Sequence, residues 1–273
     1  MDRNPIVAGR FYDGDPRRLY GEVGRYLDAA GPMDAVRTLL VMAPHAGYVY
    51  SGRVAGMALG RANLASVIVM LGPNHTGNGK PTALWPAGQW LVPGGSVPVD
   101  EKLASAILQA DPRCEEDHTA HLYEHSLEVM VPFISELGRR RGVTFSIVPI
   151  AVAETRFDKL MESGRNMGRL LSKWQEPVSI LVSSDMSHYV SRERAASLDT
   201  MALEAVEALD PQKLYETVRS NNISMCGVLP MTMGLAAALE MGAQRAEIVE
   251  YATSGDVSGD YDQVVGYAGA VVN

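Results

Sequence analysis

The chain has 273 residues, of which 47% are hydrophobic and 21% charged, a composition typical of globular proteins with ample material for a core. Its formal net charge of −8 argues against nucleic acid or an anionic membrane surface as a partner, and its two cysteines exclude a disulfide framework. The start of the chain shows no apolar signal core, and no apolar run approaches the ~20 residues that cross a bilayer. We therefore expect a cytoplasmic protein.

Apolar strand-like runs alternate with helical patterns along the whole chain, without a repeat or a linker, which predicts one domain over residues 1–273. The expected fold is α/β, a three-layer sandwich with a central, largely parallel (mixed) sheet flanked by helices. Helices are predicted, in chain order, at 16–30, 52–64, 101–109, 124–137, 156–174, 194–209, 211–219 and 227–241. Strands are predicted at 38–43, 67–71, 144–149, 178–182, 247–251 and 264–272, with 83–85 and 89–92 forming a hairpin beside the site.

Histidines follow three of the predicted strands at the point where each strand ends. The strand at 38–43 runs into Pro44-His45, the strand at 67–71 into Gly72-Pro73-Asn74-His75, and the strand at 178–182 reaches His188. Parallel strands would bring these three imidazoles to one edge of the sheet, which is where ligands bind in open α/β folds. The sequence therefore predicts a shared site there.

Two other side chains are candidates for chemistry at this site. Asp185 lies three residues before His188; on a helix the two would share a face, and the carboxylate would orient a ligand or poise a base. Alternatively, the polar run 183–185 simply caps the next helix. Cys226 precedes an apolar helix, where a thiol tends towards thiolate, and is a candidate metal ligand or nucleophile. The other interpretation is a small buried apolar residue.

A short motif offers a different metal site. His121-Leu122-Tyr123-Glu124-His125 matches H-x-x-E-H, the zinc signature of one metallopeptidase group. On a helix, His121 and His125 would bind zinc and Glu124 would act as the base, so a zinc metallopeptidase is a remote alternative. Glu124 and His125 are also expected to reach the site at the strand ends.

Several stretches of the chain, taken together and in order, closely resemble the Memo family, whose bacterial and archaeal members are often called AmmeMemoRadiSam system protein B. These stretches are Ala8-Gly9-Arg10-Phe11-Tyr12, Pro44-His45-Ala46-Gly47-Tyr48 with Tyr50-Ser51-Gly52, Gly72-Pro73-Asn74-His75, Glu124-His125-Ser126-Leu127-Glu128, Ser183-Ser184-Asp185-Met186-Ser187-His188-Tyr189, Cys226-Gly227, Tyr251-Ala252-Thr253-Ser254-Gly255-Asp256 and Val265-Gly266-Tyr267. The resemblance departs from the usual family pattern at Met186 and at Val92-Pro93-Gly94-Gly95. We expect the second of these departures to reshape the rim of the site.

This resemblance implies a fold similar to the class III extradiol ring-cleaving dioxygenases, which use non-haem iron. Carried over by motif, it implies His45, His75 and Cys226 as metal ligands. Asp185 and His188 would line the same cavity, with Glu124 and His125 near it. The dioxygenases complete their site with a carboxylate where the Memo pattern offers the cysteine. Two histidines and a thiolate suit Fe2+, the expected cofactor, with copper or zinc as alternatives.

The expected function is that of a metal-binding, non-haem-iron dioxygenase-like redox protein, in which His188, oriented by Asp185, moves protons. The alternative is a non-catalytic protein that uses the same cavity to bind a metal or a peptide. The expected ligand is a small molecule or a peptide, and the resemblance fixes neither the substrate nor the oligomeric state.

Overall fold

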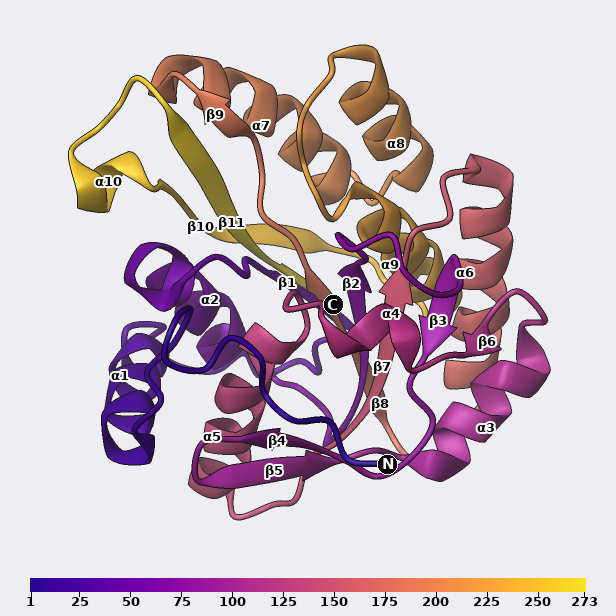
Figure 1. Ribbon diagram of the computed structural model, residues 1–273. Coiled ribbons are helices and arrows are strands. Elements are labelled where there is room, and N and C mark those ends of the chain that lie inside the picture. The colour runs from indigo at the N-terminus through magenta and orange to yellow at the C-terminus, as the bar shows by residue number, and fades with distance from the viewer.

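The computed structural model describes residues 1–273 and contains a nine-stranded mixed sheet between two layers of helices (Figure 1). The strand order is β10-β11-β1-β8-β2-β7-β3-β6, with β9 paired to β11, and β4 and β5 form a separate two-stranded sheet. This architecture confirms the predicted α/β sandwich. The strands are β1 (Leu40–Ala43), β2 (Val67–Pro73), β3 (Thr82–Leu84), β4 (Gln89–Val92), β5 (Gly95–Pro98), β6 (Glu115–Glu116), β7 (Ser146–Val152), β8 (Val178–Ser183), β9 (His188–Val190), β10 (Ala246–Thr253) and β11 (Val264–Val272).

The helices alternate with these strands along the chain. The α-helices are α1 (Pro16–Asp28), α2 (Tyr48–Arg61), α3 (Glu101–Ala110), α4 (Thr119–Leu122), α5 (Val131–Arg141), α6 (Phe157–Leu171), α7 (Arg192–Glu207), α8 (Pro211–Ser220), α9 (Val228–Glu240) and α10 (Gly255–Ser258), and η1 (Glu128–Met130) is a 3-10 helix. As predicted, Asp15 caps α1, accepting from the amides of Arg17 and Arg18, and Pro16 begins it. None of the helices combines the length and apolarity that crossing a membrane requires.

The centre of the sheet is parallel and places three strand ends together. Strand β8 lies between β1 and β2 and is parallel to both, with Ala43 of β1 opposite Ser183 of β8 and Leu71 of β2 opposite Val182. All residues of these three strands are buried, as their continuous apolar runs predict for strands covered on both faces. Their carboxyl ends therefore form one edge that carries the segments after β1, β2 and β8.

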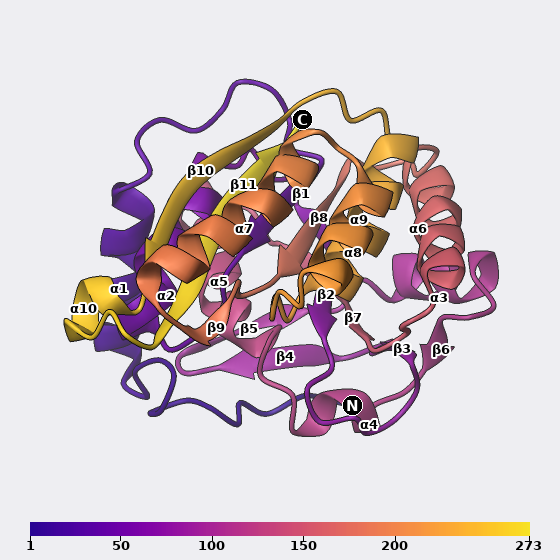
Figure 2. The same cartoon turned by 90° about the horizontal axis from the view of Figure 1, so that it is seen from above.

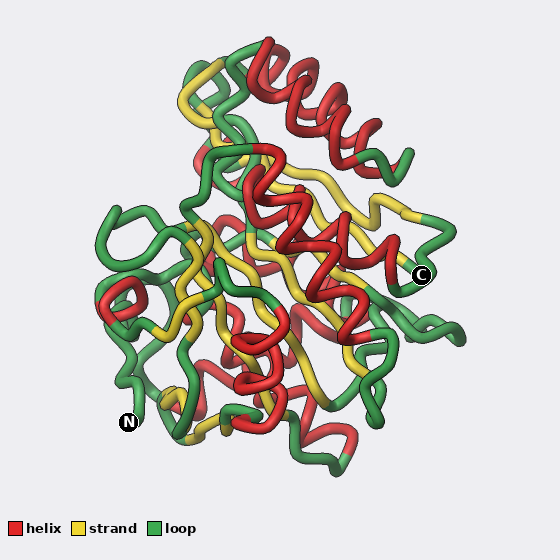
Figure 3. Tube along the Cα trace, turned by 90° about the vertical axis from the view of Figure 1, so that its right-hand side faces the viewer, coloured by secondary structure: helices red, strands yellow, loops and turns green.

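Helices cover both faces of the sheet. Helix α9 packs on β1, β2, β7 and β8, with α6 and α8 outside it, while α2 packs on β1, β10 and β11, with α1 beside it. Figure 2 shows α6, α7, α8 and α9 over one face, and Figure 3 shows the strands running between helices on either side. One cluster of 69 buried hydrophobic residues includes residues from Val7 to Val272. This continuous core supports a single domain over residues 1–273, which stays a prediction.

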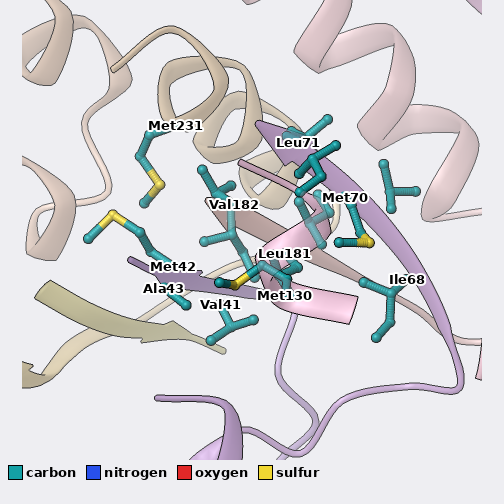
Figure 4. Packing of buried hydrophobic residues seen from close by; sticks show 14 of the residues in the cluster. Val41, Met42, Ala43, Ile68, Met70, Leu71, Met130, Leu181, Val182 and Met231 are labelled. Carbon is teal, nitrogen blue, oxygen red and sulfur yellow. The ribbon is translucent and has the colours of Figure 1, made fainter. Parts of the chain in front are cut away.

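Methionines fill the interfaces between the sheet and its covering elements (Figure 4). Met231 of α9 and Met130 of η1 pack with Met42, Met70 and their neighbours on β1, β2 and β8, and all four of these methionines are fully buried. A flexible thioether adapts to irregular gaps between a twisted sheet and its helices. This packing fixes the strand ends on which the candidate site depends.

Two local predictions are wrong. Segments 83–85 and 89–92 do not form a hairpin: β3 pairs with β7 and β6, and β4 pairs with β5. The turn of β4–β5 at Gly94 packs against Pro16 and Tyr20 of α1, and its effect on the rim of the site stays a prediction. The helix predicted at 124–137 begins only at Glu128, since residues 123–127 are irregular and carry site residues instead.

Candidate metal centre

Three imidazole rings meet beyond the carboxyl ends of the parallel strands. His45 follows β1, His75 follows β2, and His125 lies in the irregular segment between α4 and η1. One ligand-capable nitrogen from each ring lies within 4.8 Å of the other two, and the ring centroids are 5.2 to 5.5 Å apart. Because neutral imidazole is the commonest protein metal ligand, this cluster could hold a metal ion.

A chain of hydrogen bonds fixes the ring of His45. Its Nδ1 lies 2.5 Å from the Oγ of Ser183, and that hydroxyl donates to the carbonyl oxygen of Ser126 at 2.7 Å. Since the hydroxyl proton is committed to Ser126, Ser183 accepts from Nδ1 and leaves the lone pair of Nε2 free. Burial, followed by repulsion from the other two histidines, lowers the pKa of His45 well below its ordinary value. A neutral ring with a free nitrogen is what a metal ligand requires.

A single carboxylate orients the ring of His75. The Oε1 of Glu124 accepts from the Nδ1 of His75 at 3.0 Å and from the amides of His125 and Ser126 at 2.8 and 2.9 Å. Burial opposes ionisation of Glu124, but the hydrogen bond and charge of His75, with the backbone donors, outweigh it and lower the pKa to about 2. Burial likewise opposes charge on His75, yet Glu124 raises the pKa of that ring. Glu124 thus holds Nδ1–H, and Nε2 remains available to a metal.

The centre is open to solvent on one side. The side chains of His75 and His125 are 35% and 25% exposed, while that of His45 is 2% exposed. Phe11 stands edge-on to His125, with 4.7 Å between the ring centroids, and so borders the opening. A small ligand can therefore approach from the side of His75 and His125.

Cys226 joins the buried side of the cluster. Its Sγ lies 3.4 Å from the Nε2 of His45 and accepts from the amide of Asp185 at 3.2 Å, while the Oδ1 of Asp185 accepts from the amide of His45 at 2.8 Å. Burial, and then the negative charge of Asp185, raise the pKa of Cys226, so the thiol is not activated by its place before α9. Burial also raises the pKa of Asp185. A metal cation bound beside Cys226 would lower the pKa of its thiol and favour the thiolate.

The strand-end pattern predicts His188 as the third clustered imidazole, but His125 takes that place, and His188 lies in a strand instead of a helix. It begins β9, which pairs with β11, so the helical spacing expected between Asp185 and His188 is wrong. Ser224 orients the ring: its Oγ accepts from the amide of His188 at 2.7 Å, and its carbonyl oxygen lies 3.0 Å from Nδ1. A carbonyl only accepts, so Nδ1 carries the proton and Nε2 can accept one. The alternative that residues 183–185 cap the next helix is also wrong, because Ser191 caps α7.

His121 does not share a metal site with His125, which removes the geometric basis of the zinc-peptidase alternative. Helix α4 ends at Leu122, and the Nε2 of His121 donates to the carbonyl oxygen of Ala83 at 2.9 Å. The ring is 1% exposed and packs edge-on against Trp85 and Trp90. Burial lowers its pKa to about 4. His121 is a neutral core residue.

Sequence reasoning placed His125 near the centre without identifying it as part of the histidine cluster, and it missed Ser126 and Ser224. His125 follows no strand, so the strand-end pattern does not apply to it. Ser126 acts through its carbonyl oxygen, which every residue carries, and Ser224 acts through both its carbonyl oxygen and its Oγ; neither role is signalled by the residue type alone. The clues to His125 were the H-x-x-E-H motif and the family-like stretch 124–128.

Comparisons with known proteins bear on the family and the fold of the chain. A family model described as Memo-like protein matches residues 3–271. A MEMO1 family protein of Aquifex aeolicus is 40% identical, with 98% of each chain covered, and one of Methanopyrus kandleri is 38% identical, with 99% of each covered. One of Thermotoga maritima is 36% identical over the whole of both chains. The crystal structure of the uncharacterized protein JW3007 from Escherichia coli K12 shares the fold, with a TM-score of 0.55, 14% identity, and 85% and 99% of the two chains covered.

Proposed function

We propose that this chain, which belongs to the Memo-like protein family, binds a redox-active metal and acts as a dioxygenase-like oxidoreductase on a small molecule. The observation that carries the proposal is the meeting of His45, His75 and His125 at one sheet edge, with Cys226 against His45. Nitrogen and sulfur donors of this kind suit Fe2+ or copper, and zinc is the alternative.

The proposed ligands are His45, His75 and Cys226. Ser183 and Glu124 hold the Nδ1 atoms of the two rings, which leaves both Nε2 atoms for the metal. The Sγ of Cys226 is already in contact with the Nε2 of His45. His125 offers a further nitrogen donor on the solvent side. A bound Fe2+ would supply Lewis acidity and one-electron chemistry at this position.

The remaining polar groups handle the substrate and its protons. His188 accepts a proton at Nε2, because Ser224 binds its Nδ1–H. Asp185 holds the backbone of His45 and the sulfur of Cys226, and so keeps the ligands of two different elements together. The exposed faces of His75 and His125 leave the approach for a small phenolic or comparable substrate.

The test is anaerobic loading of the metal-free protein with Fe2+, followed by measurement of oxygen consumption over a panel of catechols and other phenols. We expect one bound ion per chain, oxygen uptake with at least one substrate, and loss of uptake without loss of iron in His188→Gln. A loaded protein that consumes no oxygen with any of them would instead support the non-catalytic role in metal or peptide binding. A wild-type chain that takes up no metal would contradict the proposed function and leave only the peptide-binding form of the alternative.

A further inference from the structure

Arg3, close to the start of the chain, is buried against the segment that carries Glu124 and His125. Its side chain is 2% exposed. The Nε of Arg3 donates to the carbonyl oxygen of His121 at 3.0 Å, and Nη2 donates to the carbonyl oxygen of Glu124 at 2.5 Å. Nη1 forms an ion pair with Glu128 at 2.8 Å. One guanidinium therefore binds three points along residues 121–128.

Glu128 completes this connection from the other side. Its carboxylate is 1% exposed and accepts from the amides of Ile6 and Val7 at 2.9 and 3.0 Å and from the Oη of Tyr12 at 2.8 Å. Together with Arg3, these contacts bind residues 3–12 to residues 121–128 through two buried, paired charges. Loss of one partner of such a pair strongly destabilises the folded protein, because the other partner remains charged and buried.

The segment between these contacts has little structure of its own. Helix α4 ends at Leu122 and η1 begins at Glu128, so residues 123–127 form no helix or strand, and their main chain makes only isolated turn hydrogen bonds, such as that from the amide of Val129 to the carbonyl oxygen of His125 at 3.1 Å. Yet Glu124 orients His75, and His125 supplies a ring of the cluster. The position of this main chain therefore depends on outside partners, and Arg3 binds the carbonyl of Glu124 itself.

We infer that Arg3 is a positioning residue of the metal centre: its guanidinium sets the main-chain position of Glu124 and His125 and thereby the affinity for the metal. The inference rests on the proposed metal-binding function. The planar fork of Arg3 donates from three separate nitrogens to two carbonyl oxygens and a carboxylate at once, whereas a lysine has a single nitrogen. A lysine in its place keeps the charge beside Glu128 but cannot make all three contacts.

The experiment compares Arg3→Lys with a matched control, Arg141→Lys. Arg141 also donates to two carbonyl oxygens, those of Ala62 and Leu64 at 3.0 and 2.9 Å, and its guanidinium lies over Phe145. Ala62 and Leu64 precede β2, so these contacts lie at the amino end of that strand, whereas the histidines lie at the carboxyl end. Both variants are titrated with Co2+, whose visible spectrum reports the ligand geometry, well below their unfolding temperatures. We expect Arg3→Lys to weaken Co2+ binding about tenfold and to change the spectrum, and Arg141→Lys to do neither.

A second measurement uses the wild-type chain, so it does not depend on the variant folding. Hydrogen exchange of the Ile6 and Val7 amides, which donate to Glu128, is followed with and without Co2+. If the metal centre and the N-terminal segment are coupled through Arg3, Co2+ slows both amides. Unchanged exchange, an unchanged affinity of Arg3→Lys, or equal losses in both variants would overturn the inference while leaving the metal centre intact. Failure of the wild-type chain to bind Co2+ would instead overturn the proposed function.

Discussion

The Nδ1 of His75 lies 3.0 Å from the Oε1 of Glu124, and the same oxygen accepts from the amide of His125 at 2.8 Å. One buried carboxylate thus positions a ring that follows β2 and the backbone of the residue that supplies a second ring. Both carboxylate oxygens of Glu124 accept hydrogen bonds, Oε2 from the amide of His75 and Oε1 from the His75 ring and the amides of His125 and Ser126. The geometry of the centre depends on contacts behind the rings as much as on the rings themselves.

Replacing Glu124 by glutamine should weaken metal binding without unfolding the chain. The amide keeps an acceptor for His75 but loses the charge that holds its Nδ1–H, so we expect a ~10- to 100-fold loss of affinity in a Co2+ titration. Glu136→Gln is the control, since Glu136 is equally buried but bound to Arg139 and Arg140 on α5. Equal affinities of Glu124→Gln and the wild-type chain would contradict this role.

Ser183→Ala should weaken metal binding by releasing the ring of His45. Without the hydroxyl, Nδ1 has no acceptor, and the buried ring can shift its proton to the nitrogen that the metal needs. We expect a loss of about tenfold in metal affinity. Ser179→Ala is the matched control, because Ser179 is equally buried on the same strand and donates to the carbonyl oxygen of Thr38 at 2.6 Å, away from the centre. The prediction fails if both variants lose affinity alike.

Acid should remove a defined part of the stability of the metal-free chain. The pKa of Glu124 is about 2 in the folded state and 4.5 in its ordinary state, so the unfolded chain binds the proton first as the pH falls. The low folded-state pKa of Glu124 therefore adds on the order of 3 kcal/mol to the free energy of unfolding above pH 4.5, and this stabilisation is lost between pH 4.5 and about 2. The free energies of unfolding of the wild-type chain and of Glu124→Gln, measured in urea, should therefore converge as the pH falls through this range. Parallel pH profiles would show that Glu124 is not held as described.

His121→Ala should lower stability and leave the metal centre unchanged. Removing the ring leaves a cavity between Trp85 and Trp90 and frees the carbonyl oxygen of Ala83, so we expect a loss of about 2 kcal/mol in the free energy of unfolding. Metal content, measured on the folded variant, should equal that of the wild-type chain. Loss of metal in His121→Ala but not in His45→Ala would revive the peptidase alternative.

The parts of the fold that sequence predicts well are those in which one local pattern decides the outcome. The apolar runs before His45, His75 and Ser183 are buried strands because both of their faces are covered, and their parallel pairing brings the two histidines together. The cap at Asp15 depends on its own side chain and the next three residues. Such features need no knowledge of distant partners.

The features that sequence missed depend on distant partners. β3 pairs with β7 and β6, which follow it by dozens of residues, and nothing in its three residues favours them over β4. His188 belongs to β9 because β11 pairs with it, although its spacing from Asp185 suits a helix. Residues 123–127 leave the helical pattern because Arg3, His75 and Ser183 hold them in another conformation. Local propensity yields to such tertiary contacts.

The most direct test of the account is an anomalous-scattering map of crystals loaded with Fe2+, recorded at the iron absorption edge. We predict one strong peak at the carboxyl ends of β1 and β2, about 2.0–2.3 Å from the Nε2 atoms of His45 and His75 and from the Sγ of Cys226. A peak bound to neither histidine, or iron scattered over surface carboxylates, would contradict the central claim that these strand ends form a metal centre.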